Sequence, residues 1–416
     1  MLKRFRYQIA IFFAVMGPGL ITANVDNDSG GILTYSQAGA QYGYTLLWMI
    51  IPITLALIVV QEMCARMGVV TGKGLSDLIR EEFGLRLTFV LMILLVFVNY
   101  TNVVTEFIGI AGSLHLFHVS RFISVPICAA LVWYIVVRGN YKSTEKIFIV
   151  ASLVYIAYIF AGVLSQPSWH TALLATVKLP ERTMWRDKAY MYMAIGVVGT
   201  TIAPWMQFYL QSSVVEKGIR VKDYPASRLD VIVGSLFTDI VAWFIIVACA
   251  ATLFVHGMGS IQVAADAAEA MRPLAGDYAF LLFAFGLFNA SVFAASILPI
   301  STAYTVCEGM GFESGVDKSF REAPFFYWLY TLLIAGGAIT VLVLPDAELI
   351  NFAILSQVLN GVLLPVVIIL MLLLINRTDL MGAHKNSRLW NWIAWGTSVI
   401  VIAMTLVMLW GMMSGH

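Results

Sequence analysis

Charged side chains are scarce in this sequence. Asp, Glu, Lys and Arg make up 12% of the 416 residues and hydrophobic residues make up 60%, whereas a soluble protein has about 25% charged residues. Long apolar runs exclude a transmembrane β-barrel, whose strands alternate in short segments. The net charge of +1 gives no bulk attraction for nucleic acid. The composition therefore predicts an all-α polytopic membrane protein that contacts the lipid bilayer and has no nucleic-acid partner.

Cysteine and histidine are also scarce. None of the four cysteines forms a Cys-x-x-Cys pair, so neither a metal finger nor a disulfide framework is indicated. Histidine is the usual proton relay near neutral pH. None of the six histidines lies in the middle of an apolar span; they are His115, His118, His170, His256, His384 and His416. A site at mid-membrane therefore lacks this group.

Eleven apolar segments with polar breaks between them predict eleven transmembrane helices in one domain, residues 1–416. Their approximate bounds are 9–40, 44–70, 86–117, 121–138, 144–166, 188–214, 228–256, 276–307, 323–345, 348–376 and 389–413. Most are long enough to cross a bilayer as a helix. The first is interrupted by Ser29-Gly30-Gly31 and the sixth by Ala203-Pro204.

The two interruptions lie five spans apart. Interrupted helices at corresponding positions of two halves are typical of an inverted-repeat transporter with its site at mid-membrane. Spans 1–5 (residues 1–166) and spans 6–10 (residues 188–376) are the predicted repeats, and residues 389–413 form an additional helix. Most of the 25 Lys and Arg residues fall in segments that share a side with the N-terminus. This asymmetry predicts a cytoplasmic N-terminus and an extracytoplasmic C-terminus.

Asp28 is the strongest candidate for a functional group. A charged side chain at mid-bilayer costs at least ~3 kcal/mol, and the glycines that follow Asp28 free backbone carbonyls, which is tolerated where they line a cavity. Asp26 points about 200° away from Asp28 in an intact helix, so it joins the same site only if the helix unwinds. These groups predict a cation site. The alternative is that Asp28 only caps the second half-helix.

The sixth span offers a matching half of such a site. Pro204 removes a backbone donor and frees a carbonyl one turn earlier, so the carbonyl oxygens around Ala203 are predicted ligands. The alternative is a simple proline kink. Gln357 in span 10 adds a neutral amide oxygen, although a buried glutamine also serves as an interhelical hydrogen bond.

Other polar groups lie within the predicted spans. Asn102 and Glu106 share one face of span 3 and are candidates for the transport path, with Glu106 acting as a relay, a structural partner or part of a water path. Asp239 in span 7 and Glu62 in span 2 are expected to form structural pairs.

Several runs resemble the Nramp family of divalent-metal transporters. They are Gly17-Pro18-Gly19, QAGAQYGYTLLW from Gln37, ARMGVVTGK from Ala65, Glu106-Phe107-Ile108-Gly109, Ser356-Gln357-Val358, Leu364-Pro365 and RTDLMG from Arg377. The resemblance extends from residue 17 to 382. It implies the LeuT-type fold, with inverted repeats of helices 1–5 and 6–10 and with helices 1 and 6 broken. It also implies that Asp28 is a metal ligand.

The sequence departs from the family at the expected metal site. The family's Asp-Pro-Gly-Asn becomes Asp28-Ser29-Gly30-Gly31, so the ligand asparagine is Gly31. The family's Met-Pro-His becomes Ala203-Pro204-Trp205, which loses a soft thioether and a histidine tied to proton transfer. A second family histidine falls at Leu210, and the acid three residues before Glu106 is Val103. This pattern resembles the Nramp-related magnesium transporters, an uncoupled branch of the family.

The resulting hypothesis is a transporter that imports Mg²⁺, and also Mn²⁺, as a partly hydrated ion without proton coupling. Losing the thioether removes a preference for transition metals, and Mg²⁺ is usually bound by oxygen atoms with waters retained. Alternatives are a proton-coupled Mn²⁺/Fe²⁺ transporter and a sodium-coupled organic-solute symporter of the same fold. An intramembrane aspartyl enzyme is disfavoured, because no Gly-x-Gly-Asp sequence occurs in a later span. We expect a monomer in the plasma membrane with no permanently bound cofactor.

Overall fold

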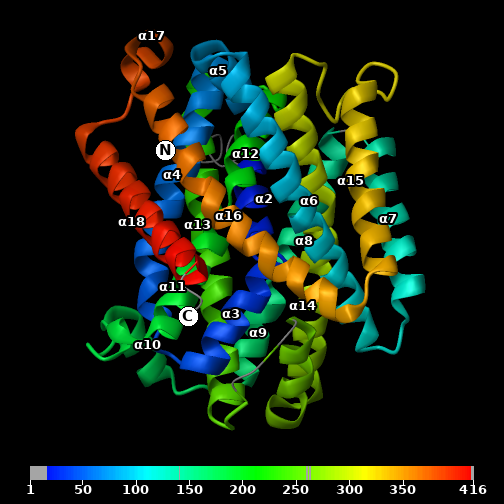
Figure 1. Cartoon of the computed structure of the whole chain (residues 1–416), viewed down its shortest axis with the longest axis vertical. Helices are drawn as coiled ribbons and strands as arrows, with labels where there is room; N and C mark the ends of the chain where they lie inside the picture. The colour runs from blue at the N-terminus through cyan, green and yellow to red at the C-terminus, as the bar shows by residue number, and fades with distance from the viewer. Residues whose placement is uncertain (1–15, 140, 259–260, 262–263, 414–416) are drawn as a thin grey trace, which may run out of the picture.

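The computed structural model describes residues 16–139, 141–258, 261 and 264–413, and this part of the chain is helical throughout its regular structure (Figure 1). The longer helices are α2 (Pro18–Val25), α3 (Ser29–Tyr42), α4 (Ile50–Thr71), α5 (Leu75–Phe83), α6 (Leu85–His115), α7 (Arg121–Arg138), α8 (Tyr141–Val154), α9 (Ile156–Leu164), α10 (Trp169–Val177), α11 (Lys188–Thr201), α12 (Pro204–Glu216), α13 (Tyr224–Cys249), α14 (Ala264–Met310), α15 (Pro324–Val343), α16 (Asp346–Ile375) and α18 (Arg388–Met413). The short α17 (Thr378–Met381) precedes α18. The prediction of an all-α chain is therefore confirmed.

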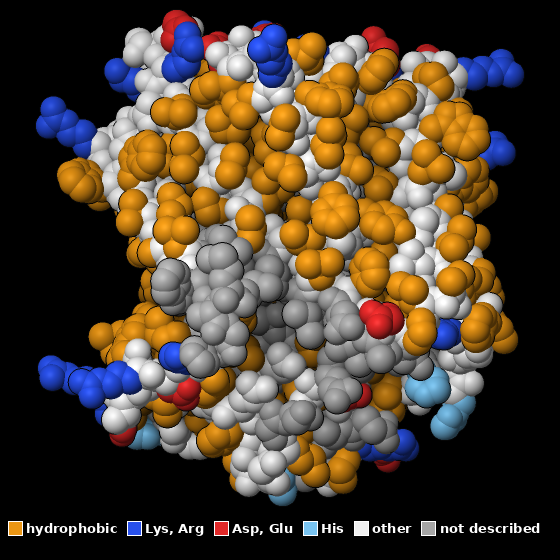
Figure 2. Space-filling model, viewed as in Figure 1, with side chains coloured by type: hydrophobic (Ala, Val, Ile, Leu, Met, Phe, Trp, Pro, Cys, Tyr) orange, Lys and Arg blue, Asp and Glu red, His pale blue; other side chains and the backbone are white. Residues whose placement is uncertain are grey.

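Apolar side chains cover the flank of the molecule. Figure 2 shows hydrophobic side chains across the middle of one face, with most Lys, Arg, Asp and Glu side chains at its upper and lower ends. Within the described residues, nine helical segments are long and apolar enough to cross a membrane. The α2–α3 pair and α18 are not among these nine, so the total of eleven spans stays a prediction. The apolar flank fits a protein surrounded by lipid.

The first predicted span is two helices with an irregular link. The structure corrects the position of this break: α2 ends at Val25 and α3 begins at Ser29, so the link is Asp26-Asn27-Asp28 and not Ser29-Gly30-Gly31. The physical reason is capping, because an aspartate before a helix satisfies amide groups of the first turn. The glycines therefore lie inside the first turn of α3.

The sixth predicted span is also two helices, α11 and α12. Their link is Ile202-Ala203, and Pro204 opens α12. Proline is well suited to the first turn of a helix, where its missing amide proton is not needed. The predicted break is therefore confirmed, and the chain has one broken helix in each predicted half. The fifth predicted span is one helical segment, Ser143–Leu164, in which only Tyr155 separates α8 from α9.

Small residues bring the broken first helix close to its neighbours. A Cβ atom placed on Gly19 of α2 would lie 2.6 Å from the Val231 backbone nitrogen, and one on Gly234 of α13 would lie 2.7 Å from the Gly19 oxygen. On the other half, a Cβ atom on Gly109 of α6 would lie 2.3 Å from the Ser29 hydroxyl oxygen. At these three glycines the crossings of α2 with α13 and of α3 with α6 leave little room for a side chain. Glycine is common where membrane helices pack closely.

Candidate functional site

Asp28 lies at the break in the first span and caps α3. Its Oδ1 atom accepts a hydrogen bond from the Gly31 amide at 2.7 Å, and the residue is buried, with 8% of its surface exposed. Asp28 therefore caps α3, as one interpretation of the sequence predicts. It does not exclude cation binding, because each carboxylate oxygen has more than one lone pair.

Gln357 of α16 and Thr200 of α11 lie against the first turn of α3. A Cβ atom on Gly30 would be 2.0 Å from the Gln357 Nε2 atom, and one on Gly31 would be 3.4 Å from both Asp28 Oδ1 and the Thr200 hydroxyl oxygen. The Gln357 Oε1 atom is buried and accepts no hydrogen bond. The fold therefore brings an aspartate, the side-chain amide of Gln357 and a hydroxyl together around the two glycines.

Gly31 also lies directly against the irregular link. A Cβ atom there would be 2.5 Å from the Asp26 backbone oxygen, which is closer than real Cβ contacts. Glycine at this position therefore lets the Asp26 carbonyl approach the first turn of α3.

Glu106 of α6 completes an acidic pair with Asp28. Its Oε2 atom accepts a hydrogen bond from the Ser29 amide at 3.1 Å, its Oε1 atom has no partner, and the side chain is fully buried. The two carboxylates interact electrostatically. In the described part of the chain neither forms an ion pair with a basic side chain. Two acids at the amino end of α3 gain from the helix dipole, but they still lack a counterion.

The Ala203-Pro204-Trp205 segment opens α12. The Ala203 oxygen accepts from the Met206 amide at 3.2 Å, and the Gln207 side chain lies 2.7 Å from the Ala203 and Pro204 oxygens in the orientation in which its nitrogen donates to both. The Ala203 carbonyl, a predicted ligand, therefore already has donors within the protein.

Trp205 is buried, and its backbone oxygen accepts from the Ser301 hydroxyl at 3.1 Å. The residue therefore joins α12 to α14 beside the break.

Asn102 forms a reciprocal amide pair with Asn360 of α16. Its Nδ2 donates to Asn360 Oδ1 at 3.1 Å, and Asn360 Nδ2 donates back to Asn102 Oδ1 at 3.0 Å. Thr105 and Ser356 form a further contact at 3.2 Å between the same two helices. These bonds place Asn102 at the α6–α16 interface, one turn from Glu106.

Asp26 and Asp239 lie on segments that the bonds of Asn27 to Thr238 join. Among charged groups, Asp239 interacts most strongly with Asp26, ahead of Asp28. The expected structural pair is confirmed for Glu62, which bonds Arg66 at 3.1 Å. It is wrong for Asp239, which has no basic partner within the described residues and whose two oxygens accept no hydrogen bond.

The amino end of α2 is held by three other helices. Asp230 of α13 accepts hydrogen bonds from the amides of Gly17, Gly19 and Leu20 at 3.2, 2.7 and 3.3 Å. Lys217, at the end of α12, bonds Glu145 of α8 at 2.6 Å. Its Nζ atom also donates to the Met16 oxygen at 2.8 Å.

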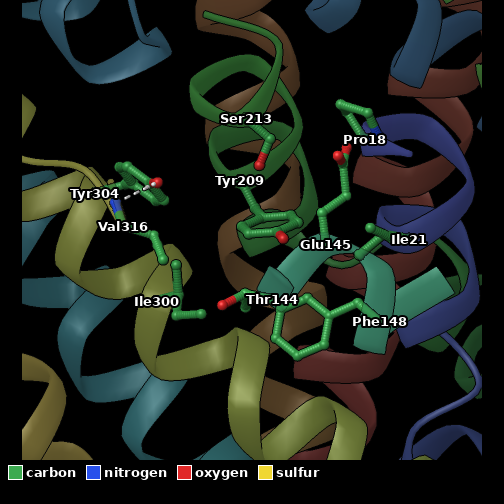
Figure 3. A pocket seen from close by; sticks show the side chains of 10 residues that line it. All are labelled: Pro18, Ile21, Thr144, Glu145, Phe148, Tyr209, Ser213, Ile300, Tyr304 and Val316. Carbon is green, nitrogen blue, oxygen red and sulfur yellow. Dashed lines mark hydrogen bonds between the residues drawn. The ribbon is translucent and has the colours of Figure 1, made fainter. Parts of the chain in front are cut away.

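A narrow cavity of about 10 Å³ lies above this anchored end, between α2, α8, α12 and α14. Figure 3 shows Tyr209 of α12 and Phe148 of α8 facing it, with Glu145 beside Pro18. A cavity of this volume has room for at most about one water molecule.

Two residues near the site were missed from the sequence. The Thr200 hydroxyl lies beside Gly31, as described. Tyr155, at the break between α8 and α9, is fully buried, its hydroxyl has no partner, and it interacts electrostatically with Asp28 and Glu106. A tyrosine or threonine in an apolar span carries no distinctive pattern, so only the tertiary packing identifies them.

The fold and the site together define a class, the secondary transporters in which two broken helices meet around mid-membrane polar groups. Residues 19–411 match the family described as "Natural resistance-associated macrophage protein-like", so the chain belongs to the Nramp family. Curated relatives include the "Divalent metal cation transporter MntH" of Deinococcus radiodurans, 27% identical over 96% of this chain and 90% of that protein. The protein of the same description from Nostoc sp. is 27% identical over 96% of this chain and 92% of its own length.

Solved structures have the same architecture. The crystal structure of the Eremococcus coleocola manganese transporter, in complex with an aromatic bis-isothiourea substituted compound, matches with a TM-score of 0.78 and 22% identity over 97% of this chain and 87% of that chain. Mhp1, a nucleobase-cation-symport-1 family transporter, matches with a TM-score of 0.59 and 14% identity over 95% of this chain and 92% of that chain. At these identities the likeness concerns the fold, and it confirms the LeuT-type prediction.

Proposed function

We propose that this chain carries divalent metal ions across the plasma membrane, and that Mg²⁺ is its main substrate with Mn²⁺ also accepted. The observation that carries the proposal is the buried acidic pair, Asp28 and Glu106, which has no basic partner in the described part of the chain. Buried carboxylates without a counterion are strongly unfavourable. A cation arriving at the break between α2 and α3 relieves this cost.

The ligand chemistry supports Mg²⁺. Asp28 and Thr200 offer oxygen atoms beside Gly31, Gln357 has a buried amide oxygen that accepts no hydrogen bond, and the family's thioether position is Ala203. Oxygen ligands suit hard cations such as Mg²⁺ and Mn²⁺, whereas sulfur favours softer metals. Since Mg²⁺ sheds water reluctantly, we infer that it binds with part of its hydration shell. The Ala203 carbonyl, which already has donors within the protein, then contributes through water.

The membrane potential alone can drive uptake of a divalent ion without protons. A divalent ion gains about 4.6 kcal/mol for each 100 mV of inside-negative potential. The two family histidines are replaced by Trp205 and Leu210, and one acid is replaced by Val103, so groups tied to proton transfer are missing. The chain thus belongs, in our proposal, to the magnesium-transporting branch, with a cytoplasmic N-terminus, an extracytoplasmic C-terminus and a monomeric state.

Proteoliposomes that enclose a Mg²⁺-sensitive dye and a pH-sensitive dye test both parts of the proposal. We expect Mg²⁺ entry driven by an inside-negative potential, unchanged internal pH, and loss of uptake in Asp28→Asn. Exclusion of Mg²⁺ while Mn²⁺ enters would refute the ion assignment. Internal acidification that accompanies metal entry would refute the uncoupled mechanism.

A proton-coupled Mn²⁺ transporter is the second candidate. Glu106 favours it, because this carboxylate is fully buried, has one free oxygen and lies beside Asp28. Glu106→Gln separates the two candidates in the same vesicles. The variant removes acidification if Glu106 carries the proton, whereas in the uncoupled mechanism the pH is constant before and after the substitution.

A further inference from the structure

A second pair of buried carboxylates, Asp26 and Asp239, lies near the break in the first span. Asp26 belongs to the link after α2, and Asp239 belongs to α13. Each has 2% of its surface exposed, and none of their four carboxylate oxygens accepts a hydrogen bond. Within the described residues no Lys, Arg or His forms an ion pair with either. Two buried carboxylates that interact with each other and have no compensating charge are a large electrostatic cost.

Two amide oxygens add to this group. Asn27 is fully buried, and its Nδ2 donates to the Thr238 oxygen at 3.0 Å and to the Thr238 hydroxyl oxygen at 2.7 Å. These bonds hold Asn27 beside the residue that precedes Asp239. Asn24 donates its Nδ2 to the Leu20 oxygen at 2.7 Å. The Oδ1 atoms of both asparagines are buried and accept nothing.

The two hydroxyl groups that interact with these carboxylates also bond to other groups. Thr54, which lies beside Asp239, donates to the Ile50 oxygen at 2.6 Å. Tyr35, which lies beside Asp26, is 2.8 Å from the Thr201 hydroxyl.

Because Thr201 donates its only hydroxyl proton to the Val197 oxygen at 2.7 Å, Tyr35 is the donor to Thr201. The hydroxyl protons of Tyr35 and Thr54 therefore have acceptors other than the two carboxylates.

The helix dipole increases the negative potential at the same place. Asp26 follows the last residue of α2, and the carboxyl end of a helix carries partial negative charge that favours cations. An aspartate at that position, facing a second aspartate, is unfavourable unless a positive ion is present. Two carboxylates match the charge of one divalent cation, and oxygen-only ligands select a hard one.

We infer that Asp26 and Asp239, with oxygen atoms from Asn27 and the Tyr35 hydroxyl, form a second binding site for a hard divalent cation, separate from the Asp28 site. Asp28 faces Glu106 of α6 and Gln357 of α16, whereas Asp26 faces α13. An ion bound there links the irregular segment of the first span to α13. We infer this second site from the acceptors around Asp26, and it does not depend on which ion is transported.

Counting bound Mn²⁺ by equilibrium dialysis on the purified full chain tests this inference, after chelator treatment has removed bound metal. We expect two Mn²⁺ ions per wild-type chain, one in Asp239→Asn, one in Asp26→Asn and one in Asp28→Asn. Asp230→Asn is the matched control, because it changes a buried carboxylate of the same helix α13 whose oxygens have amide donors. It should retain two ions.

The possible results distinguish this inference from the proposed function. One Mn²⁺ per wild-type chain that Asp28→Asn abolishes overturns the second site and leaves the proposed transport site intact. No bound Mn²⁺ in the wild type overturns both, and binding of Na⁺ alone at the second site overturns the divalent assignment. Anomalous scattering from crystals of the wild-type chain soaked in Mn²⁺ tests the second site without relying on the folding of any variant. A peak between Asp26 and Asp239 is expected, and density at Asp28 alone contradicts the second site.

Discussion

The Asp230 carboxylate of α13 accepts a hydrogen bond from the Gly19 amide of α2 at 2.7 Å. With the amides of Gly17 and Leu20, it occupies the positions of an N-cap, although it comes from a helix more than two hundred residues later in the chain. A capping group is usually the residue before the helix. Here that residue is Gly17, whose φ of 152° is accessible to glycine and which offers no side chain.

Removing this carboxylate should loosen α2. Asp230→Ala leaves three amide groups without an acceptor in a buried place, and hydrogen bonds to a charged group contribute about 1.5–3 kcal/mol each. We expect a lower unfolding temperature and faster hydrogen exchange at the amides of Gly19 and Leu20. Asp187→Ala is the control, since Asp187 caps α11 through one exposed bond to the Ala189 amide. The idea fails if both variants lose equal stability.

The ion pair between Lys217 and Glu145 should restrict access to the cavity beside α2. In Lys217→Met, both this pair and the bond to the Met16 oxygen are lost. A cysteine placed at Ile300, which lines the cavity, should then react faster with a water-soluble thiol reagent. The native cysteines are buried and give a low background. Lys318→Met, which removes an exposed pair with Glu313, should leave the rate unchanged.

A methyl group added at Gly31 should disturb the site more than a methyl group added at another glycine of the same region. Gly31→Ala places its Cβ 2.5 Å from the Asp26 backbone oxygen, whereas Gly199→Ala in α11 meets nothing within 4 Å. We expect Mg²⁺ uptake to fall at least tenfold in Gly31→Ala, a barrier change of about 1.4 kcal/mol. Gly199→Ala should gain stability of up to about 1 kcal/mol, because alanine favours helix. Equal uptake in the two variants would show that the contact has no role.

The amide pair of Asn102 and Asn360 should act as a unit. Asn102→Ala leaves the Asn360 amide buried without its partner, which costs about 1–3 kcal/mol. Asn102→Ala with Asn360→Ala should cost less than the sum of the single changes, because each single change already removes the pair. Thermal unfolding of the four proteins measures the coupling. Additive losses would mean that the two amides stabilise the protein independently.

Much of the architecture follows from the sequence. The helices are predicted by apolar runs of helical length. Their two breaks are predicted by Pro204 in one run and by an aspartate in another. The break in the first span lies three residues before its predicted position. The glycines suggest a flexible segment, but the Asp28 side chain caps α3 and so sets the residue at which this helix begins. The contact of Gln357 with Gly30 depends on the crossing of α16 and α3, which no local pattern specifies.

The pairing of buried acids was the least predictable part. Asp239 was expected to have a structural partner, since intramembrane charges usually pair. Asp26 and Asp239 instead interact with each other, and only the spatial arrangement of α2 and α13 reveals this. Tyr155 and Thr200 were overlooked for a similar reason, because their hydroxyls matter through position and not through a motif.

The glycine crossings have a mechanical consequence. Gly19 and Gly234 place the backbones of α2 and α13 in direct contact. Gly39 of α3 lies equally close to α13, since a Cβ atom there would lie 2.4 Å from the Ile246 oxygen. Both halves of the first span are therefore packed against one helix, and we expect α2, α3 and α13 to move together when the transporter changes conformation.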